Sequence, residues 1–302
     1  MVQGLATLAV VALVARSLGR NWAEFRSVHT ALTVKPAGIA ASLLAVSATY
    51  VIQIEAWRSV LRGWGQHIGF GPAARAWALA NLGRYVPGKV WSVAGLVVLA
   101  RRAGVQVAPA AASAFVSQAI VVGAGAAVVA AVTPHAASPL RLAAAGAAAL
   151  ATVGVLVWKP TARWLGRLVN ATAPLEPLRA AAALTSSGLA VLGWLGYGAA
   201  FWLLANSLVA DRALPFALAT GVFALGYILG WLAPFAPGGV GVRELVLISL
   251  LTPFLGSGGA VAVSIGSRVL LTVTEAGAAL ASVVLVRRAA SEESPDSSRH
   301  PS

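Results

Sequence analysis

Long apolar stretches separated by short polar or basic connections run along most of the chain. Six of them predict ordinary membrane-spanning helices, and they lie at about 2–15, 36–56, 110–132, 139–157, 184–209 and 258–286. A helix needs about 20 predominantly apolar residues to cross a bilayer, so all but the first have sufficient length. The pattern therefore predicts an all-α polytopic membrane protein, followed by a polar, disordered tail over 289–302.

Two further apolar stretches, at about 71–100 and 213–253, differ because each is broken near its middle by Pro-Gly. The first break reads Asn81-Leu-Gly-Arg-Tyr-Val-Pro-Gly-Lys-Val-Trp91, and the second reads Ala233-Pro-Phe-Ala-Pro-Gly-Gly-Val-Gly-Val-Arg-Glu244. Proline removes an amide donor and glycine relaxes the backbone, so helices stop there. Non-helical backbone at membrane depth persists only where it is buried in protein or lines a polar cavity. We therefore expect two re-entrant hairpins.

The breaks also indicate an internal repeat, because Pro87 and Pro237 lie 150 residues apart (237 − 87). The same shift brings two pairs of predicted spans into register. A single flippase-like domain over 1–288 would then hold repeats at about 1–135 and 136–288, each with three spans and one hairpin. Because three crossings are an odd number, the second repeat would be inverted and the hairpin tips would meet near the midplane. Interrupted helices at matching positions of inverted repeats indicate a transport site.

Composition agrees with a membrane location and leaves part of the topology open. Hydrophobic residues make up 59% of the chain and charged residues 10%, whereas soluble domains carry about 25% charged residues. The net charge of +13 comes from arginines and lysines in short connections, which is typical of positive-inside loops and not of nucleic-acid binding. We predict the cell (cytoplasmic) membrane and a cytoplasmic C-terminus. If 71–100 crosses once instead of re-entering, the N-terminus lies outside.

The sequence carries no pattern typical of an enzyme. There is no cysteine, and the four histidines are not spaced as metal ligands, so we expect no metal site and no cofactor. The motifs G-x-S-x-G, H-E-x-x-H and the P-loop pattern are absent. The longest connection, at about 158–183, is too short for a catalytic domain. The sequence therefore predicts a protein that is not an enzyme.

The candidate substrate-binding residues are polar or turn-forming residues in the two breaks and polar residues inside two spans. They are Asn81, Arg84, Tyr85, Pro87, Gly88, Lys89, Gln118, Pro237, Gly238, Gly239, Arg243, Glu244, Arg268 and Glu275. A charged side chain at the bilayer centre costs about 2.5–3.5 kcal/mol on insertion scales, so a favourable interaction must offset this cost. A bound anionic head group would do so, helped by free amides at a helix start. The alternatives are cations that snorkel to an interface and ion pairs that only hold helices together.

Within the last span, Arg268 and Glu275 lie seven residues apart (275 − 268) and therefore share a helical face, with Thr272 between them. The internal repeat pairs Arg268 with Gln118, which is also polar inside an apolar span. We therefore expect these residues and Ser117 to surround one central cavity. A buried network with a purely structural role is the alternative.

Two smaller groups have more local interpretations. Arg243 and Glu244 are adjacent, so on a helix they point in different directions and should have different partners. Glu55, Trp57 and Arg58 end the span 36–56 and are interpreted as interface anchors.

The two breaks resemble the signatures of the lysylphosphatidylglycerol synthase transmembrane-region family. The first signature comprises 81–91 followed by Ala100-Arg-Arg-Ala-Gly-Val105, and the second is Pro237-Gly-Gly-Val-Gly-Val-Arg-Glu244. The resemblance implies a flippase-like membrane domain, which in the bifunctional synthetase/flippase carries aminoacylated lipid across the bilayer. We expect no synthetase domain here, so lysyl transfer is not implied, and Ser117 and Gln118 stand where many members carry an acidic and basic pair. The substrate is therefore expected to differ from a cationic aminoacyl lipid.

Together these observations predict a protein that translocates or binds a lipid with an anionic head group, such as a phospholipid or a polyprenyl-phosphate-linked sugar. The alternatives are a non-transporting membrane scaffold for a lipid- or glycan-modifying enzyme, and a small-solute or ion-coupled transporter. A partner enzyme of lipid or glycan metabolism and a homo-oligomer both stay open, whereas nucleic acid is not expected as a partner.

Overall fold

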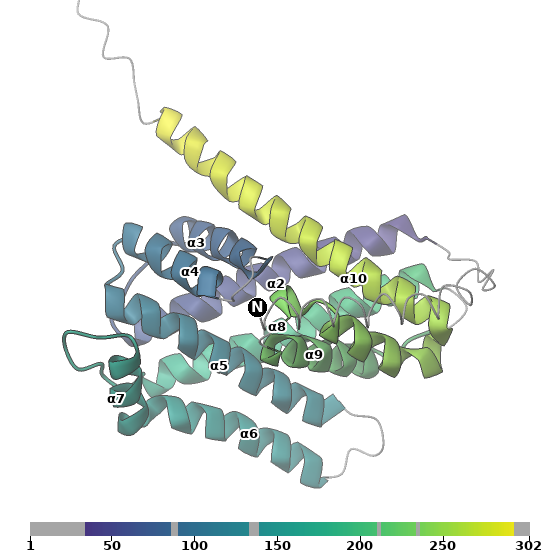
Figure 1. The fold of residues 1–302 in the computed structure, drawn as a ribbon, viewed down its shortest axis with the longest axis horizontal. Coiled ribbons are helices and arrows are strands. Elements are labelled where there is room, and N and C mark those ends of the chain that lie inside the picture. The colour runs from purple at the N-terminus through teal and green to yellow at the C-terminus, as the bar shows by residue number, and fades with distance from the viewer. Residues whose placement is uncertain (1–33, 86–89, 133–138, 210–212, 234–235, 293–302) are drawn as a thin grey trace, which may run out of the picture.

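A computed structural model describes residues 34–85, 90–132, 139–209, 213–233 and 236–292, and every element in these ranges is helical (Figure 1). The longer helices are α2 (Pro36–Gly63), α3 (Phe70–Leu82), α4 (Val90–Arg102), α5 (Val107–Val132), α6 (Pro139–Val157), α7 (Lys159–Leu168), α8 (Ala180–Leu208), α9 (Phe216–Leu232) and α10 (Val242–Glu292). Two short 3₁₀ turns, η1 (Gly83–Tyr85) and η2 (Pro237–Gly239), follow α3 and precede α10.

Four helices are long and apolar enough to cross a membrane, and there are up to five spans if the bent pair of α6 and α7 counts as one. The four are α2, α5, α8 and the stretch Val242–Val284 of α10. They coincide with four predicted spans, and α6 coincides with the predicted span 139–157. The prediction of an all-α polytopic membrane protein is thus confirmed for the described residues, while the predicted span 2–15 lies outside them.

Helix α8 is central to the bundle and packs most extensively along α2. Small residues allow this close approach: a methyl group on Gly196 of α8 would lie only 2.4 Å from Oγ1 of Thr49 on α2. The two helices are also joined by hydrogen bonds, because the Ser42 hydroxyl donates to the Ala200 carbonyl and the Ser186 hydroxyl donates to the Ala56 carbonyl. The abundant glycine therefore serves close helix packing here.

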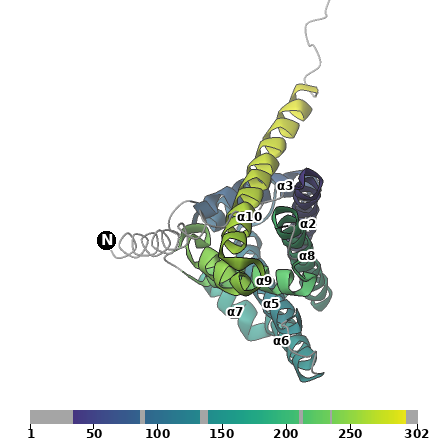
Figure 2. The ribbon, with the colours of Figure 1, turned by 90° about the vertical axis from the view of Figure 1, so that its right-hand side faces the viewer.

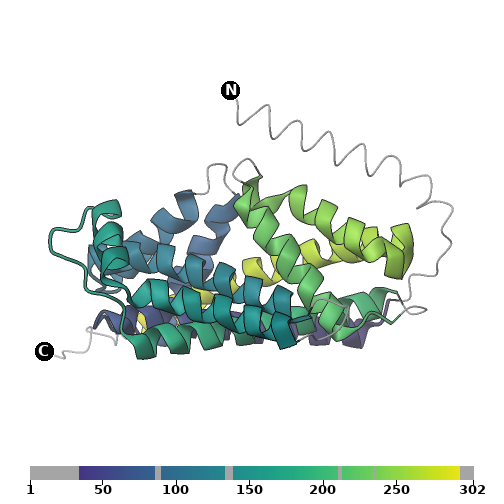
Figure 3. The ribbon, with the colours of Figure 1, turned by 90° about the horizontal axis from the view of Figure 1, so that it is seen from below.

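The two Pro-Gly breaks lie between short helices that form two hairpins. The first hairpin consists of α3, η1 and α4, and the second consists of α9, η2 and the start of α10. Figure 3 shows the hairpins converging from opposite ends of the molecule, and η1 contacts η2 where they meet. The sequence order long helix, short helix, turn, short helix, long helix thus occurs twice in the described chain.

Helix α10 is too long for a single crossing and is interrupted at Gly256. Its apolar stretch Val242–Val284 has 43 residues, whereas a crossing needs about 20. Gly256 has φ 73° and ψ 167°, a backbone conformation that residues with a side chain rarely adopt. The break separates the short hairpin segment from a long segment that extends out of the bundle (Figure 2). This long segment continues to Glu292, so the predicted tail 289–302 begins in a helix, and the rest of the tail lies outside the described residues.

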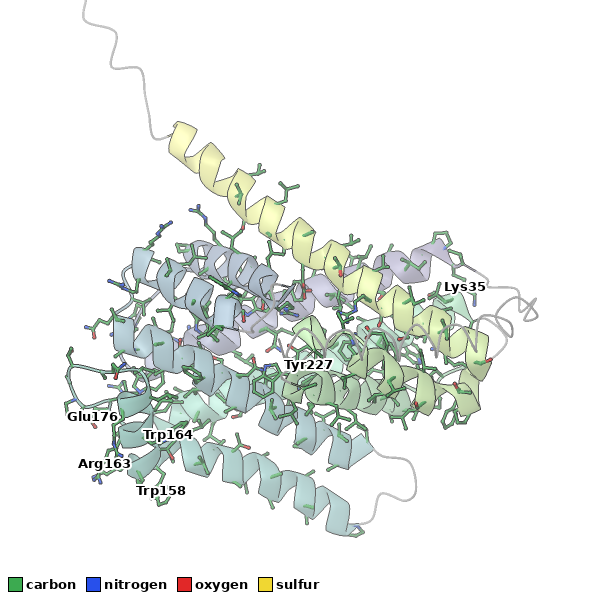
Figure 4. The ribbon with its side chains drawn as sticks, viewed as in Figure 1. Lys35, Trp158, Arg163, Trp164, Glu176 and Tyr227 are labelled. Carbon is green, nitrogen blue, oxygen red and sulfur yellow. The ribbon has the colours of Figure 1, made fainter. Side chains whose placement is uncertain are left out.

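The connection predicted at about 158–183 contains a helix, α7, bent by 65° from α6. Its basic residues, Lys159, Arg163 and Arg167, stand four positions apart and therefore share one helical face. Arg163 and Trp164 lie at one end of the molecule, whereas Lys35 lies at the opposite end (Figure 4). The basic connection is therefore an ordered amphipathic element and not a plain loop.

Candidate functional site

A cavity of about 140 Å³ lies among α2, α3, α4, α5, α8 and α9. Aromatic side chains form much of its wall, namely Trp57, Trp77, Trp194, Tyr197 and Tyr227. Polar side chains also reach it, namely Gln53, Asn81, Arg84, Ser92, Ser117, Gln118 and Ser186. Figure 4 places Tyr227 near the centre of the molecule. The cavity is thus an aromatic chamber with several polar groups inside an apolar bundle.

Arg84 contributes the charge of this cavity and connects the two halves of the molecule. It lies in η1, immediately after α3, and its Nη2 donates to Oδ1 of Asn81 at 2.6 Å. Its Nη1 lies 2.8 Å from Oε1 of Glu275 on α10, whose side chain is only 3% exposed. A buried carboxylate of this kind requires a partner, so the ion pair fixes η1 against α10.

Three polar atoms around the cavity are buried without a hydrogen-bond partner in the described part of the chain. They are Nδ2 of Asn81, Oγ of Ser117 and Nε2 of Gln118. Buried polar groups in proteins are usually paired, and leaving one unpaired costs about 1–3 kcal/mol. These two amide groups and one hydroxyl can therefore donate hydrogen bonds to a bound polar group.

The second break closes on itself through Glu244. The Oε2 atom of this carboxylate accepts a hydrogen bond from the backbone N–H of Gly241 at 2.6 Å, and Oε1 accepts one from Nε of Arg268 at 2.8 Å. Arg268 also donates from Nη1 to the Gly238 carbonyl at 3.2 Å. A positive φ at Gly238, Gly239 and Gly241 lets the backbone fold tightly around this network.

Arg243 is buried next to the same break but takes no part in that network. It is 6% exposed, its Nη2 lies 3.3 Å from Oγ of Ser267, and its guanidinium carbon lies 4.7 Å from the centre of the Phe223 ring. No carboxylate among the described residues forms a salt bridge with it, and its Nε has no hydrogen-bond partner there. A buried guanidinium that, among the described residues, is compensated only by a hydroxyl and a ring is suited to an anionic ligand.

An aromatic layer joins Arg243 to the cavity. Phe223, under the guanidinium, stacks on Tyr197 with ring centres 5.7 Å apart and an interplanar angle of 24°. Tyr197 in turn lines the cavity and contacts Trp194 edge-on. The second break and the cavity are therefore neighbouring parts of one site, separated by a layer of rings.

The structure brings most predicted site residues to these two places. Asn81, Arg84 and Gln118 line the cavity, whereas Gly238, Gly239, Arg243, Glu244 and Arg268 lie at the second break, and Glu275 pairs with Arg84. The predictions for Pro87, Gly88 and Lys89, and for the side chains of Tyr85 and Pro237, lie outside the described residues. As predicted, Arg243 and Glu244 have different partners.

Two interpretations are wrong. Arg268 does not line the cavity with Ser117 and Gln118, because its guanidinium turns to Glu244 and the Gly238 carbonyl. Trp57 is not an interface anchor, since it is 2% exposed, lines the cavity and donates from Nε1 to the Ser113 hydroxyl at 2.9 Å. Helix α2 continues to Gly63, so Trp57 lies well before its end.

The aromatic wall was not predicted from the sequence, although a signal was present. The chain has only four tyrosines, and three of them, Tyr50, Tyr197 and Tyr227, lie in or against this wall. Tyr50 packs on Trp77 with ring centres 5.0 Å apart. Tyrosines inside otherwise apolar spans, whose hydroxyls require partners, mark the polar interior of the bundle.

A comparison with protein-family models finds a match over residues 1–285 to the family described as the lysylphosphatidylglycerol synthase TM region. The match includes both breaks, the cavity residues and Glu275. A comparison with curated proteins finds no match.

Proposed function

The chain belongs to the lysylphosphatidylglycerol synthase TM-region family, and from this premise we propose that it translocates a membrane lipid with an anionic head group. The proposal rests on one observation: where the two breaks meet, three buried or half-buried arginines face two carboxylates. Arg84 and Arg268 are paired with Glu275 and Glu244, so the charge of Arg243 is left over among the described residues. A phosphate group would compensate it.

The arrangement of the breaks supports a path across the bilayer. Interrupted helices whose tips meet inside a bundle are the common design of transport sites at membrane mid-depth. In the proposed mechanism, η1 and η2 are the tips of two re-entrant hairpins in inverted repeats, and they contact each other. The head group passes between the polar tips while the acyl chains stay in the bilayer.

A reconstituted assay tests the proposal. Purified protein in liposomes should accelerate the flip-flop of fluorescent phosphatidylglycerol, and Arg243→Gln should reduce the rate about tenfold or more, since an interaction of about 1.4 kcal/mol is worth a factor of ten. Arg102→Gln is the matched control, because it removes the same charge from the exposed end of α4. If no anionic lipid moves faster than in protein-free liposomes, the proposal is wrong and a scaffold role gains support.

The proposal includes a topology in which the end of the molecule carrying α7 faces the cytoplasm, as does the C-terminus. Lys159, Arg163 and Arg167 lie on α7, and Arg101 and Arg102 end α4, whereas positive charge favours the cytoplasmic side. The cysteine-free chain permits a direct test. In cells, a membrane-impermeant maleimide should label Lys35→Cys and not Arg163→Cys; the reverse pattern would invert the proposed orientation.

A further inference from the structure

Among the described residues, the polar groups that face the cavity are neutral, with the exception of Arg84, which is already paired. Amides come from Gln53, Asn81 and Gln118, and no carboxylate of the described chain is part of the lining. A cationic head group would meet the Arg84 guanidinium without a carboxylate to bind it. An anionic group in the cavity would find, in the described part of the chain, only the Arg84 guanidinium, whose charge Glu275 already balances. The cavity is therefore suited to an uncharged, hydrogen-bonding ligand group.

The aromatic wall further limits which ligand groups fit the cavity. Ligand sites combine apolar ring faces with a few placed polar groups that fix orientation. Here Trp194 and Tyr227 meet edge-on with ring centres 5.3 Å apart, and they line the same cavity as Gln118 and Ser117, whose Nε2 and Oγ have no hydrogen-bond partner among the described residues. The amide nitrogens donate and the serine hydroxyl both donates and accepts, which matches alcohol groups. Carbon-bound hydrogens of a polyol or sugar can pack on the rings.

The size of the cavity agrees with a fragment of a lipid. Its volume of about 140 Å³ is smaller than the roughly 300–1,000 Å³ of pockets that enclose whole drug-sized ligands. A part of a head group fits such a space, with the phosphate near the arginines of the breaks and the tails outside.

We propose that this cavity binds the uncharged, hydroxyl-bearing part of the head group, a polyol or sugar linked to the lipid phosphate. This inference rests on the proposed function, and it assigns the phosphate and the hydroxyl groups to different parts of the site. Arg243 attracts the phosphate, whereas Asn81, Ser117 and Gln118 select the hydroxyl-bearing group. A site built to hydrogen-bond a hydroxyl discriminates strongly against ligands that lack one.

Four fluorescent lipids with identical acyl chains test the assignment in the liposome assay. Phosphatidylglycerol and phosphatidylinositol carry a phosphate and a polyol, phosphatidic acid carries the phosphate alone, and phosphatidylethanolamine carries an ammonium group. We expect the two polyol lipids to flip at least about tenfold faster than phosphatidic acid, although phosphatidic acid has the higher charge. Charge attraction alone predicts the opposite order.

Substitutions in the cavity should remove the preference for polyol lipids over phosphatidic acid, while the attraction of Arg243 for the lipid phosphate stays. Gln118→Leu should lower the rates of the polyol lipids about tenfold, to the level of phosphatidic acid, and leave phosphatidic acid unchanged. Gln106→Leu is the matched control, because Gln106 is exposed just before α5. Ser117→Ala removes a single oxygen atom and should shift selectivity in the same direction without affecting folding.

The possible failures are distinguishable. If no anionic lipid is flipped, the proposed function itself fails. If all anionic lipids flip at equal rates and Gln118→Leu changes none of them, the lipid-translocation proposal stands and the cavity assignment is overturned. Faster flipping of phosphatidylethanolamine than of the polyol lipids also overturns it.

Discussion

The two breaks occupy corresponding places in the chain but are stabilised differently. At η2, Glu244 binds the Gly241 amide and Arg268, and Arg268 returns to the Gly238 carbonyl, so this turn is closed by its own helix α10. At η1, Arg84 has a local contact with Asn81, and its ion pair reaches Glu275 on the other half of the chain. The second turn therefore holds its own shape, whereas the first depends on docking against α10.

The largest expected effect comes from removing that docking contact. Arg84→Met should lower the free energy of unfolding by about 3–5 kcal/mol, because removing one partner of a buried ion pair is strongly destabilising. The other partner, Glu275, has a side chain that is only 3% exposed. Unfolding in mixed micelles titrated with denaturing detergent measures the change.

A second substitution checks the cause of that loss. Glu275→Gln in the Arg84→Met background removes both charges, so the double variant should recover part of the stability. If the double variant loses as much unfolding free energy as Arg84→Met and Glu275→Gln lose in sum, the ion pair does not couple the two halves.

A smaller loss is expected when the second turn is altered. Glu244→Gln keeps an oxygen that can accept the Gly241 amide but removes the charge opposite Arg268. Hydrogen bonds to charged groups are worth about 1.5–3 kcal/mol, so the loss should fall in or below this range. In the same unfolding titration, a larger loss of unfolding free energy in Glu244→Gln than in Arg84→Met would contradict the proposal that the first turn depends more on its ion pair than the second.

The sequence was sufficient to predict the helical spans because each is long, apolar and bounded by polar residues. It also located both breaks, since Pro87-Gly88 and Pro237-Gly238 stop helices by local backbone chemistry. Helix α7 was missed because its apolar residues are spaced for an amphipathic helix and do not form a long run.

The pairing of the site residues was harder to predict, because it depends on which helix faces which. Spacing alone placed Arg268 and Glu275 on one helical face, but their partners, Glu244 and Arg84, come from the two different breaks. The role of Trp57 was likewise hidden, because an indole near the end of a span is compatible with both an interface and a buried hydrogen bond.

Close backbone packing at the two hairpins offers a finer comparison. A methyl group on Gly83 would lie 2.7 Å from the backbone nitrogen of Ser92, whereas one on Gly230 would lie 3.2 Å from Cα of Gly239. Overpacking of this kind costs about 1–3 kcal/mol, and we expect Gly83→Ala to cost more than Gly230→Ala. Gly95→Ala is the control, because its nearest neighbour would be at an ordinary 3.5 Å.

The sign of the stability change in Gly83→Ala distinguishes an effect of packing from an effect of backbone conformation. Gly83 has φ −62°, a helical conformation that alanine adopts easily, so without the contact alanine would stabilise by about 0.4–1 kcal/mol. A stabilising Gly83→Ala would therefore show that α4 can move away from η1 at little cost. The thermal midpoint in detergent, compared with that of Gly95→Ala, is the measurement.

The smallest expected effect on stability belongs to Arg243, although its effect on lipid should be large. Its buried guanidinium has Ser267 and the Phe223 ring as partners but no carboxylate in the described chain. Arg243→Met therefore removes a desolvated positive charge and leaves no carboxylate without its partner in the described chain. We expect an unfolding free energy within about 1 kcal/mol of the wild type, or slightly higher, because functional sites often retain groups that cost stability. Lipid flip-flop should nevertheless fall with Arg243→Met as with Arg243→Gln. A loss comparable to that of Arg84→Met would mean that Arg243 stabilises the second turn in the absence of lipid, and the anion-binding role would then lose its physical basis.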